Sequence, residues 1–168
     1  MKFIRLIIAG ILLTFSVFAI IKLSVSLGVL VILLSGIFVL LHFKNENNLL
    51  AFYLVRKNKS EAATKVLNKV KHPENMIKSQ EAYYYYLLGL STVHKAPLKA
   101  EKHFKKALST GLRTKTDQAL AKLNLAASAL SQRNKKLATH YITECKKLDK
   151  NKMLHTQIKE VEAMMKRI

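Results

Sequence analysis

Hydrophobic and polar residues divide the chain into two parts of different character. From Leu6 to Leu41 the residues are apolar or small, and Lys22 is the single charge. In the remainder, apolar residues recur at three- and four-residue spacing, which predicts amphipathic helices and no strands. The pattern therefore predicts an all-α chain, with a two-helix transmembrane hairpin over 1–43 and a helical domain over 44–168.

The apolar segment is too long for one membrane span and about right for two, because roughly 17–25 residues cross a bilayer. Lys22, with Ser24, Ser26 and Gly28 after it, marks a turn, so we expect spans at 3–21 and 23–43. Small residues let membrane helices approach closely. They stand at Gly10, Ser16, Ser35 and Gly36.

A cleaved signal peptide is the alternative for residues 1–19, since Lys2 and Arg5 give a basic start and "SVFA" ends at Ala19. Against it, apolar residues resume at once after that point. For a hairpin, the basic residues before the first span and after the second place both termini in the cytoplasm of a bacterial inner membrane.

Three segments after the hairpin share one pattern. "ATKVLNKV" begins at Ala63, "AEKHFKKA" at Ala100 and "ATHYITEC" at Ala138, 37 and 38 residues apart. Each has a large apolar residue four places on and a smaller residue three further, all on one helix face. An apolar pair precedes each segment by 11 or 12 residues: Leu50 with Ala51, Leu88 with Gly89, and Leu125 with Ala126.

The middle unit resembles the tetratricopeptide repeat family, whose helix A carries an aromatic residue before Leu-Gly and whose helix B carries Ala, Phe and Ala. The matching residues are Tyr85, Leu88, Gly89, Ala100, Phe104 and Ala107. In the outer units Ala63, Leu67, Leu125, Ala126, Ala138, Ile142 and Cys145 match by residue class. The repeats are longer than the usual 34 residues.

This resemblance implies an α-solenoid of about three helical hairpins, at about 47–71, 80–110 and 115–149, in which those residues pack the repeats. "MLHTQIKEVEAMMKRI" has one apolar stripe, as a capping helix over 153–168 requires.

Four consecutive tyrosines, Tyr83 to Tyr86, cannot share one helix face, because each residue turns the helix by about 100°. The family pattern places Tyr85 inside the hairpin, and Tyr83 and Tyr86 on a concave groove that binds a partner. Candidate groove residues are Tyr83, Tyr86, Leu90, Val93, His94, Leu120, Leu123, Ala127 and Leu130. Packing between neighbouring repeats is the alternative role for all four tyrosines.

Catalytic chemistry is not indicated. The six histidines are scattered without ligand spacing, and neither a phosphate loop nor a nucleophile motif appears. Cys145 falls at a packing position and forms no disulfide as the single cysteine. We expect no enzyme, metal or cofactor.

The net charge of +19 lies almost wholly in the helical domain. It has three interpretations: a solvated face, attraction to anionic lipid, or contact with RNA, the ribosome or an acidic protein. No DNA-binding motif is present. We expect a membrane-anchored adaptor or scaffold for a protein partner. The alternatives are a basic platform for polyanions, or a small structural subunit of a membrane complex.

Overall fold

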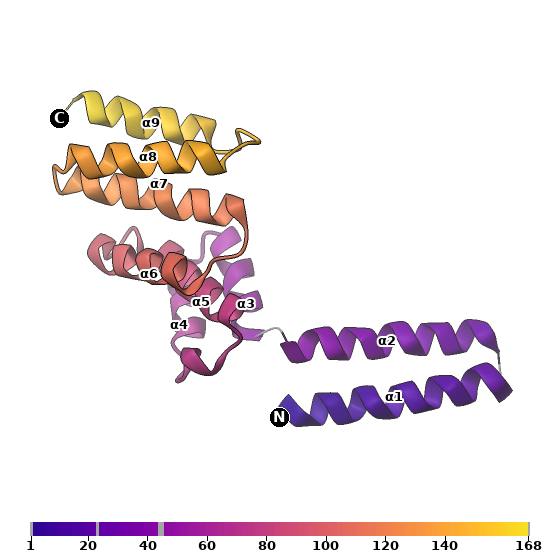
Figure 1. Ribbon diagram of the computed structural model, residues 1–168. Coiled ribbons are helices and arrows are strands. Elements are labelled where there is room, and N and C mark those ends of the chain that lie inside the picture. Colours follow the sequence, from indigo (N-terminus) through magenta and orange to yellow (C-terminus); the bar gives the residue numbers. More distant parts are fainter. Residues whose placement is uncertain (1, 23, 44–45, 168) are drawn as a thin grey trace. The chain divides into compact units, whose positions relative to one another are not determined.

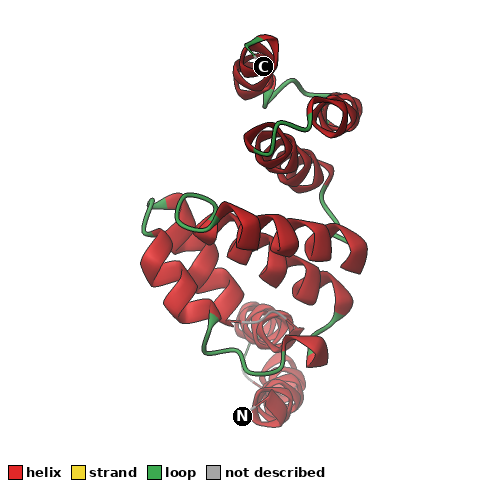
Figure 2. Ribbon diagram, turned by 90° about the vertical axis from the view of Figure 1, so that its left-hand side faces the viewer, coloured by secondary structure: helices red, strands yellow, loops and turns green. Residues whose placement is uncertain are grey.

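The computed structural model describes residues 2–22, 24–43 and 46–167, with side chains throughout these ranges except at residues 2–6, 22, 38 and 40–43. Every regular element in these ranges is a helix, so the expected all-α class is confirmed (Figure 2). The chain divides into two compact units, residues 1–46 and 47–168. Leu23 and residue 44, where the second span and the helical domain are expected to begin, lie outside the described residues, as does residue 168.

The first unit is an antiparallel pair, α1 (Lys2–Lys22) and α2 (Val25–Phe43) (Figure 1). Small side chains fill the contact between the two helices: Ala9, Ser16, Ala19, Gly28 and Ser35 are buried. Ser35 Oγ donates a hydrogen bond of 3.0 Å to the carbonyl oxygen of Ala9. Two helices can approach closely along such a stripe.

The close approach depends on a different glycine from those expected. A Cβ at Gly28 would overlap the side chain of Ile20 and lie 3.1 Å from the Ser16 carbonyl oxygen. Gly10 and Gly36 are exposed, with open space around them, so their predicted role is wrong. Each follows a residue in the contact, Ala9 or Ser35. Because one residue turns a helix by about 100°, Gly10 and Gly36 point away from the contact between the two helices.

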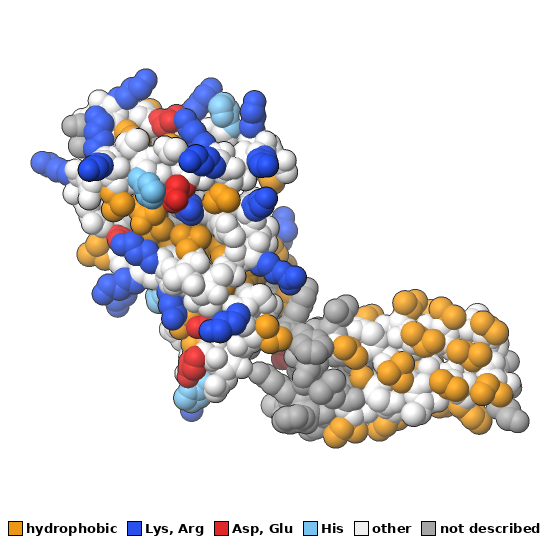
Figure 3. Space-filling view, in the orientation of Figure 1, with side chains coloured by type: hydrophobic (Ala, Val, Ile, Leu, Met, Phe, Trp, Pro, Cys, Tyr) orange, Lys and Arg blue, Asp and Glu red, His pale blue; other side chains and the backbone are white. Residues whose placement is uncertain are grey.

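Large apolar side chains cover the outside of this hairpin, as the orange surface in Figure 3 shows. When only the described residues are considered, no helix is both long enough and apolar enough to qualify as a membrane span.

The second unit is a succession of helices. They are α3 (Glu46–Arg56), α4 (Ser60–Leu67), a 3-10 turn η1 (Pro73–Asn75), α5 (Lys78–Thr92), α6 (Pro97–Thr110), α7 (Lys115–Ser131), α8 (Lys135–Leu148) and α9 (His155–Lys166). α5 packs with α6 and α7 packs with α8, while α4 lies on α5, α6 lies on α7, and α9 contacts α7 and α8 (Figures 1 and 2). The expected range 47–71 contains most of α3 and all of α4, 80–110 contains most of α5 and all of α6, and 115–149 contains α7 and α8.

Local chemistry sets the helix ends. Pro97 occupies the first turn of α6, and Gly111 ends that helix with a φ of +106°, a left-handed conformation that glycine adopts without strain. Asn134 accepts a hydrogen bond from the Leu137 amide at the start of α8. The Asp149 carboxylate accepts hydrogen bonds from the backbone amides of Met153 and Leu154, just before α9.

The core of the second unit has two clusters that meet at α7. The first lies around Leu67, Leu87 and Phe104, and the second around Leu123, Ile142 and Cys145. Leu120 and Tyr141 pack against both clusters. The helix pairs are therefore joined by continuous apolar packing.

Candidate functional site

Tyr86 is a core residue, which makes its predicted place on the groove wrong. Its side chain is 3% exposed, its ring lies 6.3 Å from that of Phe104, and its hydroxyl lies near the carboxylate of Asp117. Burial raises the pKa of the Tyr86 hydroxyl, and the neighbouring Asp117 carboxylate adds to that rise. A partner cannot reach this side chain.

Tyr83 lies at the edge of the same cluster. Its ring is 5.8 Å from Tyr86 and 6.2 Å from Phe52 of α3, measured between ring centroids. Partial burial, with the nearby charge of Asp117, raises the pKa of Tyr83 to about 12. Tyr83 therefore connects α5 to α3. Because its side chain is partly buried, only part of its surface is accessible to a partner.

Tyr85 packs between α5 and α6, and Tyr84 is buried beside it. Tyr85 is half-buried rather than enclosed, with its ring stacked on His103 at 6.4 Å and the ammonium of Lys106 5.8 Å from its centroid. Tyr84 is buried and meets Tyr85 edge-on at 5.2 Å. Gly89 and Phe104 form a fully buried part of the same contact between α5 and α6.

A cavity of about 300 Å³ opens between the C-terminal end of α5, the first turns of α6, and α7. The predicted groove residues Val93, His94 and Ala127 line it together with Glu101 and Asn124. The remaining lining residues are Pro97, Ala100, Phe104, Ser128 and Ser131. This cavity brings together predicted residues from two successive repeats.

A second cavity, of about 350 Å³, lies between α7 and the C-terminal end of α9. Ala127, Leu130, Ser131, Met164 and Arg167 line it. Ala127 and Ser131 line both cavities, so the two are adjacent along α7. We call these two adjacent cavities together the α7 groove.

Glu101 is the charged group at one end of the α7 groove. Its carboxylate accepts hydrogen bonds from Lys105 at 2.6 Å, Ser128 at 2.7 Å and Gln132 at 2.6 Å. These contacts, with that of Lys105 first, hold the pKa of Glu101 below its ordinary value. The sequence gives no signal for this cluster, because its residues come from two helices and match no motif.

The other predicted groove residues do not reach the α7 groove. Leu90 and Leu120 are partly buried against the core, and Leu123 is buried in the second cluster. The sequence misses Met164 and Arg167, because the relation between α9 and α7 depends on tertiary packing.

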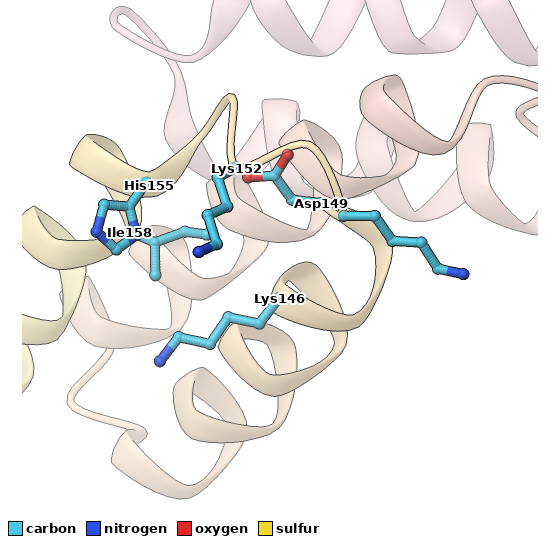
Figure 4. A pocket seen from close by; sticks show the side chains of 6 residues that line it. Lys146, Asp149, Lys152, His155 and Ile158 are labelled. Atoms are coloured by element: carbon cyan, nitrogen blue, oxygen red, sulfur yellow. The ribbon is translucent and has the colours of Figure 1, made fainter.

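A third cavity, of about 370 Å³, lies where α8 ends and α9 begins, and its lining is basic. In Figure 4 the ammonium groups of Lys146 and Lys152 lie on the same side as His155, while the Asp149 carboxylate is turned into the loop. Lys150 and Ile158 complete the lining. Lys146 is paired with Glu162 at 2.6 Å.

The residues expected to pack the repeats, apart from Tyr85, are buried. They are Ala63, Leu67, Leu88, Gly89, Ala100, Phe104, Ala107, Leu125, Ala126, Ala138, Ile142 and Cys145. Burial raises the pKa of the Cys145 thiol to about 11, so the thiol is protonated at neutral pH. Within the described part of the chain, no group of three or more His, Cys, Asp or Glu residues is placed to hold a metal ion.

No protein-family model, curated protein or solved structure matches this chain.

Proposed function

We propose that this protein is a membrane-anchored, tetratricopeptide-like adaptor that binds a segment of a protein partner in its α7 groove. The α1–α2 hairpin is the anchor, and the helical domain faces the cytoplasm of a bacterial inner membrane. Anchoring raises the local concentration of the binding domain for membrane partners.

The exposed surface of the hairpin supports the anchor. Its exposed large apolar side chains are Ile7, Ile8, Ile11, Leu13, Phe15, Val17, Phe18, Ile20, Ile21, Val25, Leu27, Val29, Leu30, Ile32, Leu33, Leu34 and Ile37. Soluble monomers rarely expose contiguous apolar patches larger than a few hundred Å². The apolar segment of the sequence, from Leu6 to Leu41, is long enough for two spans.

The observation that carries the adaptor role is the meeting of two cavities at Ala127 and Ser131. Residues expected on a concave groove, namely Val93, His94, Ala127 and Leu130, line one cavity or the other. A concave surface with apolar walls and a few polar groups is the usual form of a recognition site. The α7 groove suits an extended segment or a helix of the partner.

Ser131 and Ser109 offer a matched test of the α7 groove. Both are exposed near the end of a helix, and each hydroxyl donates to a backbone carbonyl of its own helix. Only Ser131 lines the groove. A photoreactive phenylalanine analogue at position 131 of the full-length protein, expressed in its native host, should cross-link a defined protein, and the same group at position 109 should not.

The cross-link at position 131 should disappear when Ala127→Arg fills the α7 groove, while circular dichroism shows a folded domain. Equal cross-linking from positions 131 and 109, or a cross-link that survives Ala127→Arg, would rule out the α7 groove as the partner site.

A second candidate function, binding of a polyanion such as RNA or the ribosome, is favoured by the basic cavity at Lys150, Lys152 and His155. Polyanion binding weakens steeply with salt. Retention of ribosomes or RNA that is lost in moderate salt and in Lys150→Gln with Lys152→Gln, but not in Ala127→Arg, would favour this role. Loss of a membrane complex when only the hairpin is exchanged would instead indicate a structural subunit.

A further inference from the structure

Helix α3 is apolar on two opposite faces. At about 100° per residue, Asn48, Ala51, Leu54 and Val55 share one face, and they are buried or packed against the core. The opposite face holds Leu49 and Tyr53, which are 41% and 57% exposed. Leu50 and Phe52 lie at its two edges and are 49% and 38% exposed, and the ring of Phe52 also packs against Tyr83 of α5. A surface helix of a water-soluble domain usually carries polar residues on that outer face.

Cations lie over the two aromatic rings of this outer face. The Arg56 guanidinium carbon is 5.6 Å from the centroid of Phe52, and the Lys57 ammonium is 5.8 Å from the centroid of Tyr53. Aromatic rings with attached cations are typical of the boundary between hydrocarbon and headgroups, where the ring is buried and the charge reaches the phosphates.

The chain itself brings α3 close to the end of the proposed anchor. α2 ends at Phe43 and α3 begins at Glu46, and three residue steps reach at most about 11 Å. If α2 crosses the bilayer, the first turn of α3 therefore lies within the depth of the headgroup layer.

We propose that the outer face of α3, formed by Leu49, Leu50, Phe52, Tyr53, Arg56 and Lys57, is a binding site for anionic phospholipid headgroups. The apolar side chains enter the upper acyl region, and the two cations contact lipid phosphates. This proposal rests on the proposed membrane anchoring. It adds a second membrane contact, which would hold the helical domain at the surface and restrict the directions that the α7 groove can face.

Lipid is favoured over a protein partner on two grounds. The chain allows α3 little distance from the end of α2, and Arg56 at the C-terminal end of the helix is followed by Lys57 and Lys59, so three cations outnumber the single acid of the first turn, Glu46. Anionic headgroups attract such residues, each by on the order of 1 kcal/mol.

The chain has no tryptophan, so one introduced residue gives an unambiguous fluorescence signal. Three single variants of the full-length protein are reconstituted in phosphatidylcholine vesicles with and without phosphatidylglycerol: Tyr53→Trp as the probe, Leu98→Trp as the control and Phe15→Trp as the reporter of the anchor. Leu98 is exposed on α6, and Phe15 is exposed on α1. Quenching is compared between iodide in the water and lipids brominated at shallow or deep acyl positions.

We expect the probe at position 53 to lose most of its emission to shallow brominated lipid when phosphatidylglycerol is present, and the control at position 98 to be quenched by iodide alone. Arg56→Gln with Lys57→Gln should remove the dependence on phosphatidylglycerol, and each lost charge should weaken docking roughly fivefold.

Quenching of position 53 by iodide to the same extent as position 98 would overturn the proposal. The proposal would also be overturned if position 53 were shielded from iodide equally in detergent and in lipid and were not quenched by brominated lipid. A second copy or another protein would then cover the face. Quenching of position 15 by deep brominated lipid reports the anchor independently. Its absence would refute the proposed anchoring, while position 53 would still decide whether α3 binds lipid.

Discussion

The ring of Phe104 on α6 lies directly against the backbone of Gly89 on α5. A Cβ built at position 89 would come within 2.6 Å of the ring, which is closer than real Cβ contacts. Phe104 is 1% exposed, so its ring cannot move into solvent. The absence of a side chain at Gly89 therefore sets how closely the two helices of the middle pair pack.

Gly89→Ala should destabilise the helical domain although alanine favours helix by about 1 kcal/mol. Overpacking of a well-filled core costs about 1–3 kcal/mol, so we expect a net loss of up to about 2 kcal/mol in thermal or urea unfolding. Phe104→Leu in the same chain should recover part of that loss, because the smaller side chain makes room. Additive effects of the two substitutions would contradict the contact.

Glu101→Gln should reveal a pH-dependent contribution to stability. The pKa of Glu101 is lowered in the folded protein by hydrogen bonds, that of Lys105 first and that of Ser128 next. The unfolded chain therefore binds more protons around the ordinary glutamate pKa of 4.5, and the contribution of the carboxylate is lost as pH falls through the folded pKa.

The loss of stability in Glu101→Gln should be about 1–2 kcal/mol at neutral pH and should shrink below the ordinary glutamate pKa. Thermal unfolding of both proteins at several pH values measures the difference, with the exposed Glu160→Gln as a control for loss of one charge. A loss that is constant with pH would show that the carboxylate charge does not matter.

Gly28→Ile should separate the two helices of the hairpin, whereas Gly36→Ile should not. A Cβ at position 28 overlaps Ile20, and space is open at position 36. Cysteines at Ala9 and Ser35, in a chain with Cys145→Ala, report the contact because Ser35 is hydrogen-bonded to the Ala9 carbonyl. Their disulfide yield under mild oxidation should fall only in Gly28→Ile, and a fall in both variants would mean that the glycine positions are equivalent.

Cys145 should resist thiol reagents in the folded protein at neutral pH. The rise in its pKa from 9.0 to about 11 lowers the thiolate fraction about a hundredfold, and the side chain is buried. Thr143→Cys, on the exposed face of the same helix, gives the comparison in a Cys145→Ala chain. The cysteine at 143 should react at the rate of an unfolded peptide, and equal rates at both positions would show that α8 opens readily.

The expected orientation of the tyrosines shows where reasoning from sequence ends. Helical spacing fixes the directions of Tyr83 to Tyr86 relative to one another, at about 100° each. It does not fix which direction is buried, because that depends on where α6 and α7 lie around α5. Phe104 and Asp117, which enclose Tyr86, come from those two helices. Helical spacing likewise does not determine which face of α3 is exposed, because that depends on which helices pack against α3.

What the sequence determined by itself is the part of the structure set by local interactions. Residue spacing predicted helices throughout, and the resemblance of the middle unit predicted that Gly89 packs the repeats. Tertiary structure alone decided that Gly28 rather than Gly10 or Gly36 lies between α1 and α2, that Tyr86 is buried, and that α9 closes one side of the α7 groove. The physical reason is that helix formation depends on residues three or four apart, whereas burial depends on residues far apart in the chain that packing brings together.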